Sequence, residues 1–136
     1  MSIITIVGAG MMGSAMSFPA RANGHEVRLV GTPLDRGIIE QAKETGFHIT
    51  LKRQLPEGIR FCQFEELEDA LEGADLLIGG VSSMGVDWFM DSVIPRIPAA
   101  LPVLSVTKGM VNTREGEFIS FPELYARAFQ DSGIRF

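Results

Sequence analysis

The sequence predicts a doubly wound α/β fold, in which a mostly parallel sheet forms the middle of three layers. Two observations carry this prediction. Short apolar runs rich in β-branched residues alternate with longer segments of helical composition, and the first run leads directly into the glycine-rich stretch GAGMMG, residues 8–13. Because several runs are apolar at nearly every position, we expect strands buried on both faces of the sheet.

Five strands and five helices are expected to alternate through right-handed crossovers. The strands are predicted at Ile3–Val7, Glu26–Val30, Ile59–Cys62, Leu76–Val81 and Pro102–Val106. The helices are predicted at Met11–Asn23, Leu34–Thr45, Glu65–Glu72, Met84–Ile97 and Pro122–Gln130. Residues Asn112–Gly116 are expected to form a loop, and Ile134–Phe136 to begin a sixth strand.

Glycine and proline mark where the helices end or bend. Gly24, Gly46 and Gly73 each follow a predicted helix, and glycine is the residue that most readily ends one. Pro19 lies inside the first predicted helix and has no amide hydrogen to donate. We therefore expect a kink or a restart of that helix near Ser17.

The composition is that of one globular domain, and residues 1–136 are expected to form it. Hydrophobic residues make up 46% of the chain and charged residues 21%, with a net charge of −5 and no block of Lys or Arg. A nucleic acid or an anionic membrane is therefore not expected as a partner, because both favour a basic surface. No signal peptide and no apolar run of about 20 residues is present. The chain is expected in the cytoplasm.

The potential metal ligands are few and scattered. Cys62 is the single cysteine, lies in an apolar stretch, and is expected to pack in the core of a protein from a reducing compartment. His25 and His48 share no ligand-like spacing with it. We expect no metal site.

The stretch GAGMMG has the spacing G-x-G-x-x-G between a predicted strand and a predicted helix. Gly8 would permit the tight turn, Gly10 would let a ligand approach the backbone, and Gly13 would let the helix pack on the sheet. Free N–H groups at the helix start favour a phosphate. Met11 and Met12 would present such N–H groups and cover the ligand with their thioethers. The sequence thus predicts a Rossmann-like site for the pyrophosphate of NAD or NADP.

The end of the second strand bears on the choice of cofactor. The fingerprint for NAD has an acidic residue at this point, whereas the chain reads VRLVGTPLDR and has Gly31 and Thr32 there. Without an acid to repel it, a 2′-phosphate could bond Thr32 and Arg36, which favours NADP. Asp35 is either a ribose contact or a residue that caps or decorates the second predicted helix, Leu34–Thr45.

Two further strand ends carry polar residues. The fourth strand ends GGVSS, and Ser82 and Ser83 either face the cofactor or cap the next helix. The fifth strand ends SVTKGM, and Lys108 is expected to reach the same crevice, where its ammonium could hold a substrate phosphate. The alternative for Lys108 is a solvated loop position.

These features together resemble the nucleotide-binding half of NAD(P)-dependent glycerol-3-phosphate dehydrogenases. That family has a G-A-G-x-x-G turn, an NGHEV stretch before a strand that ends near WG, a V-P-S-like end of the fourth strand and a T/S-K-G after the fifth. This chain has GAGMMG, NGHEVRLVG, GVSS and VTKGM in the same order. It departs from the family in lacking an aromatic residue at Met12 and in having Val30 in place of tryptophan.

The resemblance implies roles for several residues. Met11, Met12 and Thr32 would line the cofactor, and Lys108 would contact both the nicotinamide region and a phosphorylated substrate. The family reduces dihydroxyacetone phosphate to glycerol 3-phosphate with a general-acid lysine from a second, helical domain that follows a G-P-x-x-A segment. Neither is present in residues 1–136, so no catalytic residue is expected in this chain, and its activity alone should be low or absent. Contacts between subunits would belong to the second domain.

Two alternatives remain open at the level of the sequence. The chain could be the cofactor domain of another two-domain reductase, of the ketopantoate or 3-hydroxyacid type, which shares the glycine turn but lacks TKG. It could also be a standalone nucleotide-sensing domain.

Overall fold

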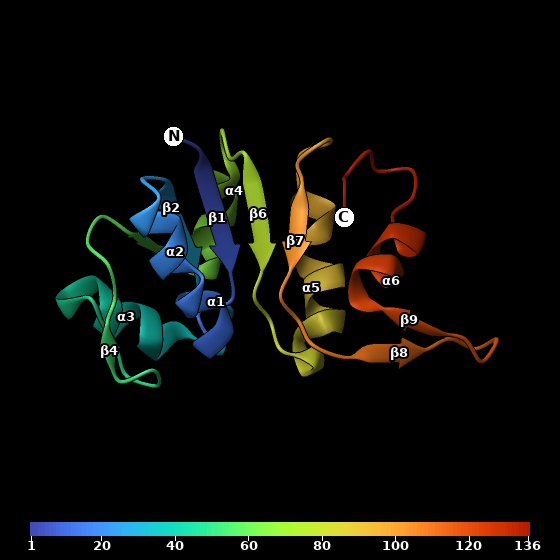
Figure 1. The fold of residues 1–136 in the computed structure, drawn as a ribbon, viewed down its shortest axis with the longest axis horizontal. Coiled ribbons are helices and arrows are strands. Elements are labelled where there is room, and N and C mark those ends of the chain that lie inside the picture. Colours follow the sequence, from blue (N-terminus) through green and yellow to red (C-terminus); the bar gives the residue numbers. More distant parts are fainter.

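The computed structural model describes residues 1–136, and its centre is a parallel sheet in the order β5-β2-β1-β6-β7. The strands are β1 (Ile3–Val7), β2 (Glu26–Val30), β5 (Arg60–Cys62), β6 (Leu76–Gly79) and β7 (Val103–Ser105). All five lie within the predicted runs, and most residues of β1, β2 and β6 are buried. The predicted doubly wound α/β fold is confirmed (Figure 1).

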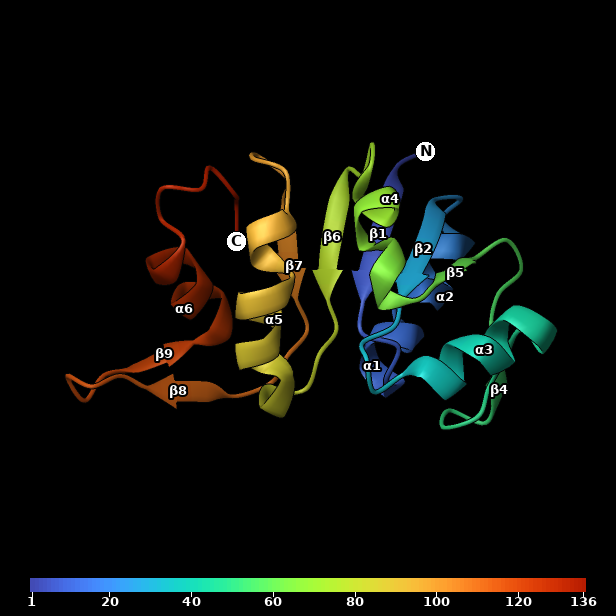
Figure 2. The ribbon, with the colours of Figure 1, turned by 180° about the vertical axis from the view of Figure 1, so that it is seen from behind.

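The helices form layers on both faces of the sheet. One face is covered by α1 (Met11–Ala15), α2 (Ser17–Ala22) and α3 (Arg36–Thr45). The other face, seen in Figure 2, carries α4 (Leu67–Leu71), α5 (Val86–Ser92) and α6 (Phe121–Ala128). Short 3₁₀ turns lie at η1 (Phe64–Glu66), η2 (Ser83–Gly85) and η3 (Ile94–Arg96). Each face encloses its own apolar cluster, so the three predicted layers are present.

The first predicted helix is broken where proline requires it. Met16 separates α1 from α2, and Pro19 lies in the first turn of α2, where a missing N–H costs least. The predicted restart near Ser17 is confirmed. Gly24, Gly46 and Gly73 also end their helices as predicted, with φ angles of +79°, +72° and +70°.

Two hairpins appear that the sequence analysis did not predict. The first joins β3 (Phe47–His48) to β4 (Arg53–Gln54), and the second joins β8 (Met110–Asn112) to β9 (Phe118–Ser120). The predicted loop at 112–116 is therefore mostly the turn of the second hairpin. The expected sixth strand is reduced to one bridge between Pro102 and Arg135, where the Val103 amide donates to the Arg135 carbonyl at 2.7 Å.

The topology brings the carboxyl ends of all five strands to one edge of the sheet. The chain leaves β1 toward β2 on one side and returns through β6 on the other, so β1 and β6 flank the point where the strand order reverses. In Figure 1 the arrowheads of β1, β6 and β7 point to this edge, and α1 and the β8–β9 hairpin lie beside it. Crevices at such a point bind ligands in open α/β sheets.

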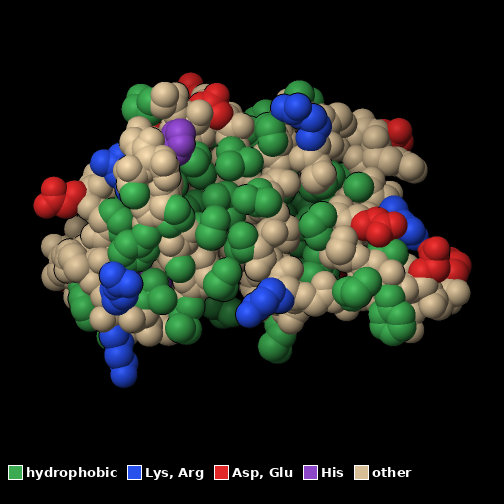
Figure 3. All heavy atoms as spheres, viewed as in Figure 1, with side chains coloured by type: hydrophobic (Ala, Val, Ile, Leu, Met, Phe, Trp, Pro, Cys, Tyr) green, Lys and Arg blue, Asp and Glu red, His purple; other side chains and the backbone are tan.

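Apolar side chains also gather on part of the sheet surface. Figure 1 shows no helix in front of β6 and β7, and Figure 3 shows hydrophobic side chains across the middle of the same face. Leu104 of β7 is 46% exposed, whereas its neighbour Val103 is buried in the apolar cluster on the opposite face. No helix in the structure is both long and apolar enough to cross a bilayer.

Candidate functional site

The glycine turn after β1 packs backbone against backbone. Gly8 has φ +109°, and a Cβ on it would lie 2.8 Å from the Gly80 carbonyl carbon. A Cβ on Gly13 would overlap the carbonyl oxygen of Gly8, and one on Gly80 would lie 2.6 Å from the Gly13 Cα. The turn roles predicted for Gly8 and Gly13 are therefore confirmed, and Gly80, the residue after β6, completes the contact.

Gly10 differs from the other glycines of this turn. A Cβ on it would meet no atom within 4 Å, and its φ of −71° and ψ of −169° suit any residue. Neither packing nor conformation within the chain requires glycine at this position. The space above its backbone belongs to the cavities beside it, and this is what a ligand that approaches the backbone would need.

Two cavities adjoin Gly10 at the carboxyl edge of the sheet. The larger, the β2 pocket, has a volume of about 540 Å³, and the smaller, the β7 pocket, about 370 Å³. The β2 pocket is lined by Gly8, Gly10, Thr32, Pro33, Leu34, Asp35, Gly80, Val81, Ser82, Met84, Gly85 and Trp88. The β7 pocket is lined by Gly10, Met11, Met12, Gly80, Val81, Ser82, Ser83, Val106, Thr107 and Lys108. They share four residues, Gly10, Gly80, Val81 and Ser82.

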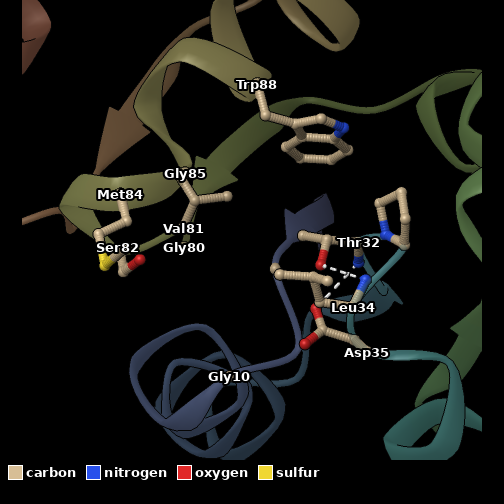
Figure 4. Close-up of a pocket in the computed structure, with 12 residues that line it drawn as sticks. Gly10, Thr32, Leu34, Asp35, Gly80, Val81, Ser82, Met84, Gly85 and Trp88 are labelled. Carbon is tan, nitrogen blue, oxygen red and sulfur yellow. Dashed lines mark hydrogen bonds between the residues drawn. The ribbon is translucent and has the colours of Figure 1, made fainter.

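Asp35 places a carboxylate in the β2 pocket (Figure 4). Its Oδ2 accepts the Ala9 amide at 3.0 Å and the Thr32 amide at 2.9 Å. Asp35 stands at the N-cap position of α3, but its side chain makes no capping hydrogen bond. The capping role considered from the sequence is therefore wrong, and so is the premise that no acid lies near the end of β2. The side chain folds back because two backbone N–H groups converge there.

Thr32 lines the β2 pocket, whereas Arg36 lines neither pocket. The Thr32 hydroxyl accepts the Leu34 amide at 3.2 Å and retains its own hydrogen for another acceptor. Arg36 forms an ion pair with Glu65, which raises the pKa of the guanidinium and lowers the pKa of that carboxyl. Contact between Arg36 and a cofactor stays a prediction.

The β7 pocket gathers most of the remaining predicted residues. Met11 and Met12 are about half exposed at its wall, Ser82 is exposed, and Lys108 extends from the loop after β7. Ser82 is the N-cap residue of η2 but makes no side-chain capping bond. The Thr107 hydroxyl donates to the Val81 carbonyl at 2.7 Å and ties the two loops together. Lys108 is the only charged side chain in this lining.

His48 supports the glycine turn through hydrogen bonds that the sequence analysis did not predict. The ring is fully buried, with Nε2 2.7 Å from the Ala9 carbonyl oxygen and Nδ1 accepting the Leu51 amide at 3.0 Å. Since Nδ1 accepts, the proton resides on Nε2 and is donated to Ala9. The β3–β4 hairpin thereby holds the peptide next to Gly10.

The geometry of the site fits several families of two-domain reductases, and a match to a family model distinguishes between them. Residues 3–124 match the family model of the NAD-dependent glycerol-3-phosphate dehydrogenase N-terminus. The chain belongs to this glycerol-3-phosphate dehydrogenase N-terminal family. The resemblance inferred from GAGMMG, NGHEV and VTKGM is thereby confirmed.

Curated relatives of this family agree with the assignment. The chain is 35% identical over 129 residues to an NADP(+)-dependent glycerol-3-phosphate dehydrogenase of Archaeoglobus fulgidus, a match that covers 95% of the chain and 38% of the relative. It is 29% identical over 110 residues to a glycerol-3-phosphate dehydrogenase [NAD(P)+] of Shouchella clausii, covering 81% and 32%. The chain thus spans about a third of the length of these relatives.

Solved structures show the same fold. A glycerol-3-phosphate dehydrogenase of Coxiella burnetii superposes with a TM-score of 0.75 at 23% identity, over 98% of the chain and 38% of that protein. A ketopantoate reductase of Ralstonia eutropha superposes with a TM-score of 0.58 at 24% identity, over 78% and 34%. At these identities the likeness concerns the fold, and the family match distinguishes the glycerol-3-phosphate dehydrogenase family from the other reductases.

Proposed function

We propose that this domain binds a nicotinamide–adenine dinucleotide across Gly10, as the cofactor domain of an NAD(P)-dependent glycerol-3-phosphate dehydrogenase. The observation that carries the proposal is the pair of cavities that meet at Gly10, a glycine for which the chain itself has no steric need. A dinucleotide matches this arrangement, because its two nucleosides would fill the two cavities and its pyrophosphate would join them at Gly10. The pyrophosphate would lie over Gly10, near the free N–H groups at the start of α1.

The proposed orientation places the adenosine half in the β2 pocket. In this fold the ribose of adenosine lies at the end of the second strand, and Thr32 and Asp35 occupy that place here. The nicotinamide half would then occupy the β7 pocket beside Met11, Met12 and Lys108. The four residues shared by both pockets, Ser82 among them, would lie along the pyrophosphate.

Between the two dinucleotides, we propose NADP as the preferred one. The Thr32 hydroxyl has a hydrogen to donate to a 2′-phosphate, and two backbone N–H groups compensate part of the Asp35 charge. The relative from Archaeoglobus fulgidus is named for NADP(+). The Asp35 carboxylate by itself favours NAD, because a carboxylate repels a 2′-phosphate and accepts hydrogen bonds from ribose hydroxyls.

The reaction proposed for the complete enzyme is hydride transfer between NAD(P)H and dihydroxyacetone phosphate. Reduction of a ketone needs an acid that protonates the developing alkoxide, in addition to the hydride. Lys108 would hold the substrate phosphate beside the nicotinamide, because it is the only charged side chain of the β7 pocket. No side chain in that lining remains to act as the acid. Residues 1–136 should therefore bind the dinucleotide without oxidising glycerol 3-phosphate at a measurable rate.

The test is calorimetric titration of the 136-residue chain with NADP⁺ and with NAD⁺. We expect saturable binding of one equivalent, with tighter binding of NADP⁺. A chain that binds neither dinucleotide would contradict the proposal. Rapid oxidation of glycerol 3-phosphate by the same preparation would contradict the inference that residues 1–136 do not supply the catalytic acid.

A further inference from the structure

Trp88 is the only aromatic side chain in the lining of the β2 pocket. It comes from the first turn of α5 and is half-buried, on a wall that no sequence motif identified. In Figure 4 its indole projects toward Thr32, with Leu34 and Gly10 beyond the open space below it. Gly80 and Gly85, also in the lining, leave the middle of the cavity unobstructed.

The indole is held in place from outside the cavity. Its ring centroid lies 5.2 Å from that of Phe64, with the planes tilted by 59°. The guanidinium of Arg96 lies over the Phe64 ring, 5.1 Å from its centroid, and makes a cation–π contact with it. The next residue, Phe89, is fully buried and anchors this turn of α5 in the core. Contact with Phe64, which does not line the pocket, therefore restricts the position of the indole.

The chemistry of the pocket changes from one end to the other. Asp35 is its only charged lining residue and, with Thr32, forms a polar corner beside Gly10. Trp88 with Pro33, Leu34 and Met84 supplies large apolar surfaces. Leu34 is 95% exposed and Met84 94% exposed, so both have apolar surface that a ligand would cover. A ligand that fits has a hydroxylated or anionic end near Gly10 and a flat, uncharged aromatic end near Trp88.

We propose that Trp88 is the surface on which the adenine ring of the dinucleotide stacks. This inference rests on the proposed function, since it assigns the adenosine half to the β2 pocket. A purine has a flat π-face that stacks on an aromatic side chain, and this contact does not involve the 2′-phosphate that distinguishes NADP from NAD. Trp88 would thus contribute to the affinity for both NAD and NADP, and leave the choice between them to Thr32 and Asp35.

The test uses the intrinsic fluorescence of the chain, which contains a single tryptophan. The probes are ADP and ADP-ribose, which have the adenine ring, and nicotinamide mononucleotide, which lacks it. We expect ADP and ADP-ribose to quench Trp88 saturably and nicotinamide mononucleotide to leave it unchanged. No substitution is needed, so this arm does not depend on the folding of a variant.

The second arm measures affinity for ADP-ribose by calorimetry in variants. Trp88→Ala should weaken binding by roughly 5- to 150-fold, the range seen when an aromatic partner of a base is removed. Trp88→Phe keeps a stacking surface and should retain most of the affinity. Phe118→Ala is the matched control, because Phe118 is 70% exposed on β9 and lines neither pocket.

The outcomes separate this inference from the proposed function. If wild-type chain binds ADP-ribose but Trp88 fluorescence does not change and Trp88→Ala binds equally well, the stacking role is wrong while dinucleotide binding stands. Quenching by nicotinamide mononucleotide alone would also overturn it, because the two halves of the cofactor would then be reversed. If calorimetry finds no binding of ADP-ribose, NAD⁺ or NADP⁺ to the wild-type chain, both proposals are wrong.

Discussion

Substitution of Gly10 by alanine should separate ligand binding from folding in this domain. A Cβ at Gly10 meets no atom within 4 Å, and the backbone there is already extended, so the folded state accommodates alanine without strain. A Gly→Ala change at a compatible position raises stability by about 0.4–1 kcal/mol. The added methyl instead occupies the space where the pyrophosphate should lie, and overpacking of this kind costs about 1–3 kcal/mol. That range corresponds to a loss of affinity of roughly 5- to 150-fold.

Gly13→Ala is the matched comparison within the same turn. Its Cβ would overlap the Gly8 carbonyl oxygen, so the backbone of β1 or α1 must shift. We expect a loss of stability of about 1–3 kcal/mol, visible as a lower midpoint of thermal unfolding by circular dichroism. Calorimetry with NADP⁺ supplies the affinity of both variants. The reasoning is refuted if Gly10→Ala binds NADP⁺ as tightly as wild type, or if it unfolds well below wild type.

Three further predictions concern the surroundings of the turn. Thr32→Glu should weaken NADP⁺ binding about tenfold or more, because the new carboxylate repels the 2′-phosphate, and should largely preserve NAD⁺ binding. Equal losses of affinity for both cofactors in calorimetry would contradict this prediction. His48→Phe should lower the free energy of unfolding by about 1–3 kcal/mol, because it leaves the buried Ala9 carbonyl unpaired and also removes the partner of the part-buried Leu51 amide. Unchanged urea unfolding would contradict this prediction. Burial raises the pKa of the Cys62 thiol above its ordinary value, so the unfolded chain releases this proton at a lower pH than the folded chain. Stability should therefore fall as pH rises above the ordinary thiol pKa of about 8.5, and Cys62→Ala should remove the fall seen below about pH 10. Above about pH 10 Tyr125 adds a fall of its own, because burial raises its pKa from 10.0 to about 12.

The parts of the fold that the sequence predicted are those governed by local signals. Four of the five strands, β1, β2, β6 and β7, carry β-branched or aliphatic runs, and Gly24, Gly46 and Gly73 follow the helices, so these elements are specified by their own residues. The β3–β4 and β8–β9 hairpins escaped prediction because their strands have only two or three residues each, too few to show an alternating pattern.

The candidate site was predictable only where a motif spans consecutive positions. GAGMMG identified the turn, and VTKGM identified the Lys108 loop. Asp35 reaches Ala9 across 26 residues and His48 reaches it across 39, and neither contact has a local signature. A capping role for Asp35 is suggested by its place at the start of the helix predicted at Leu34–Thr45, but the amides of Ala9 and Thr32 provide the partners that its carboxylate takes.

The most direct measurement of the central claim is a crystal structure of the chain grown with excess NADP⁺. We expect the pyrophosphate over Gly10, the adenine against Trp88 in the β2 pocket, and the nicotinamide beside Met12 in the β7 pocket. Density for the cofactor away from Gly10, or with the two nucleosides exchanged between the pockets, would contradict the account.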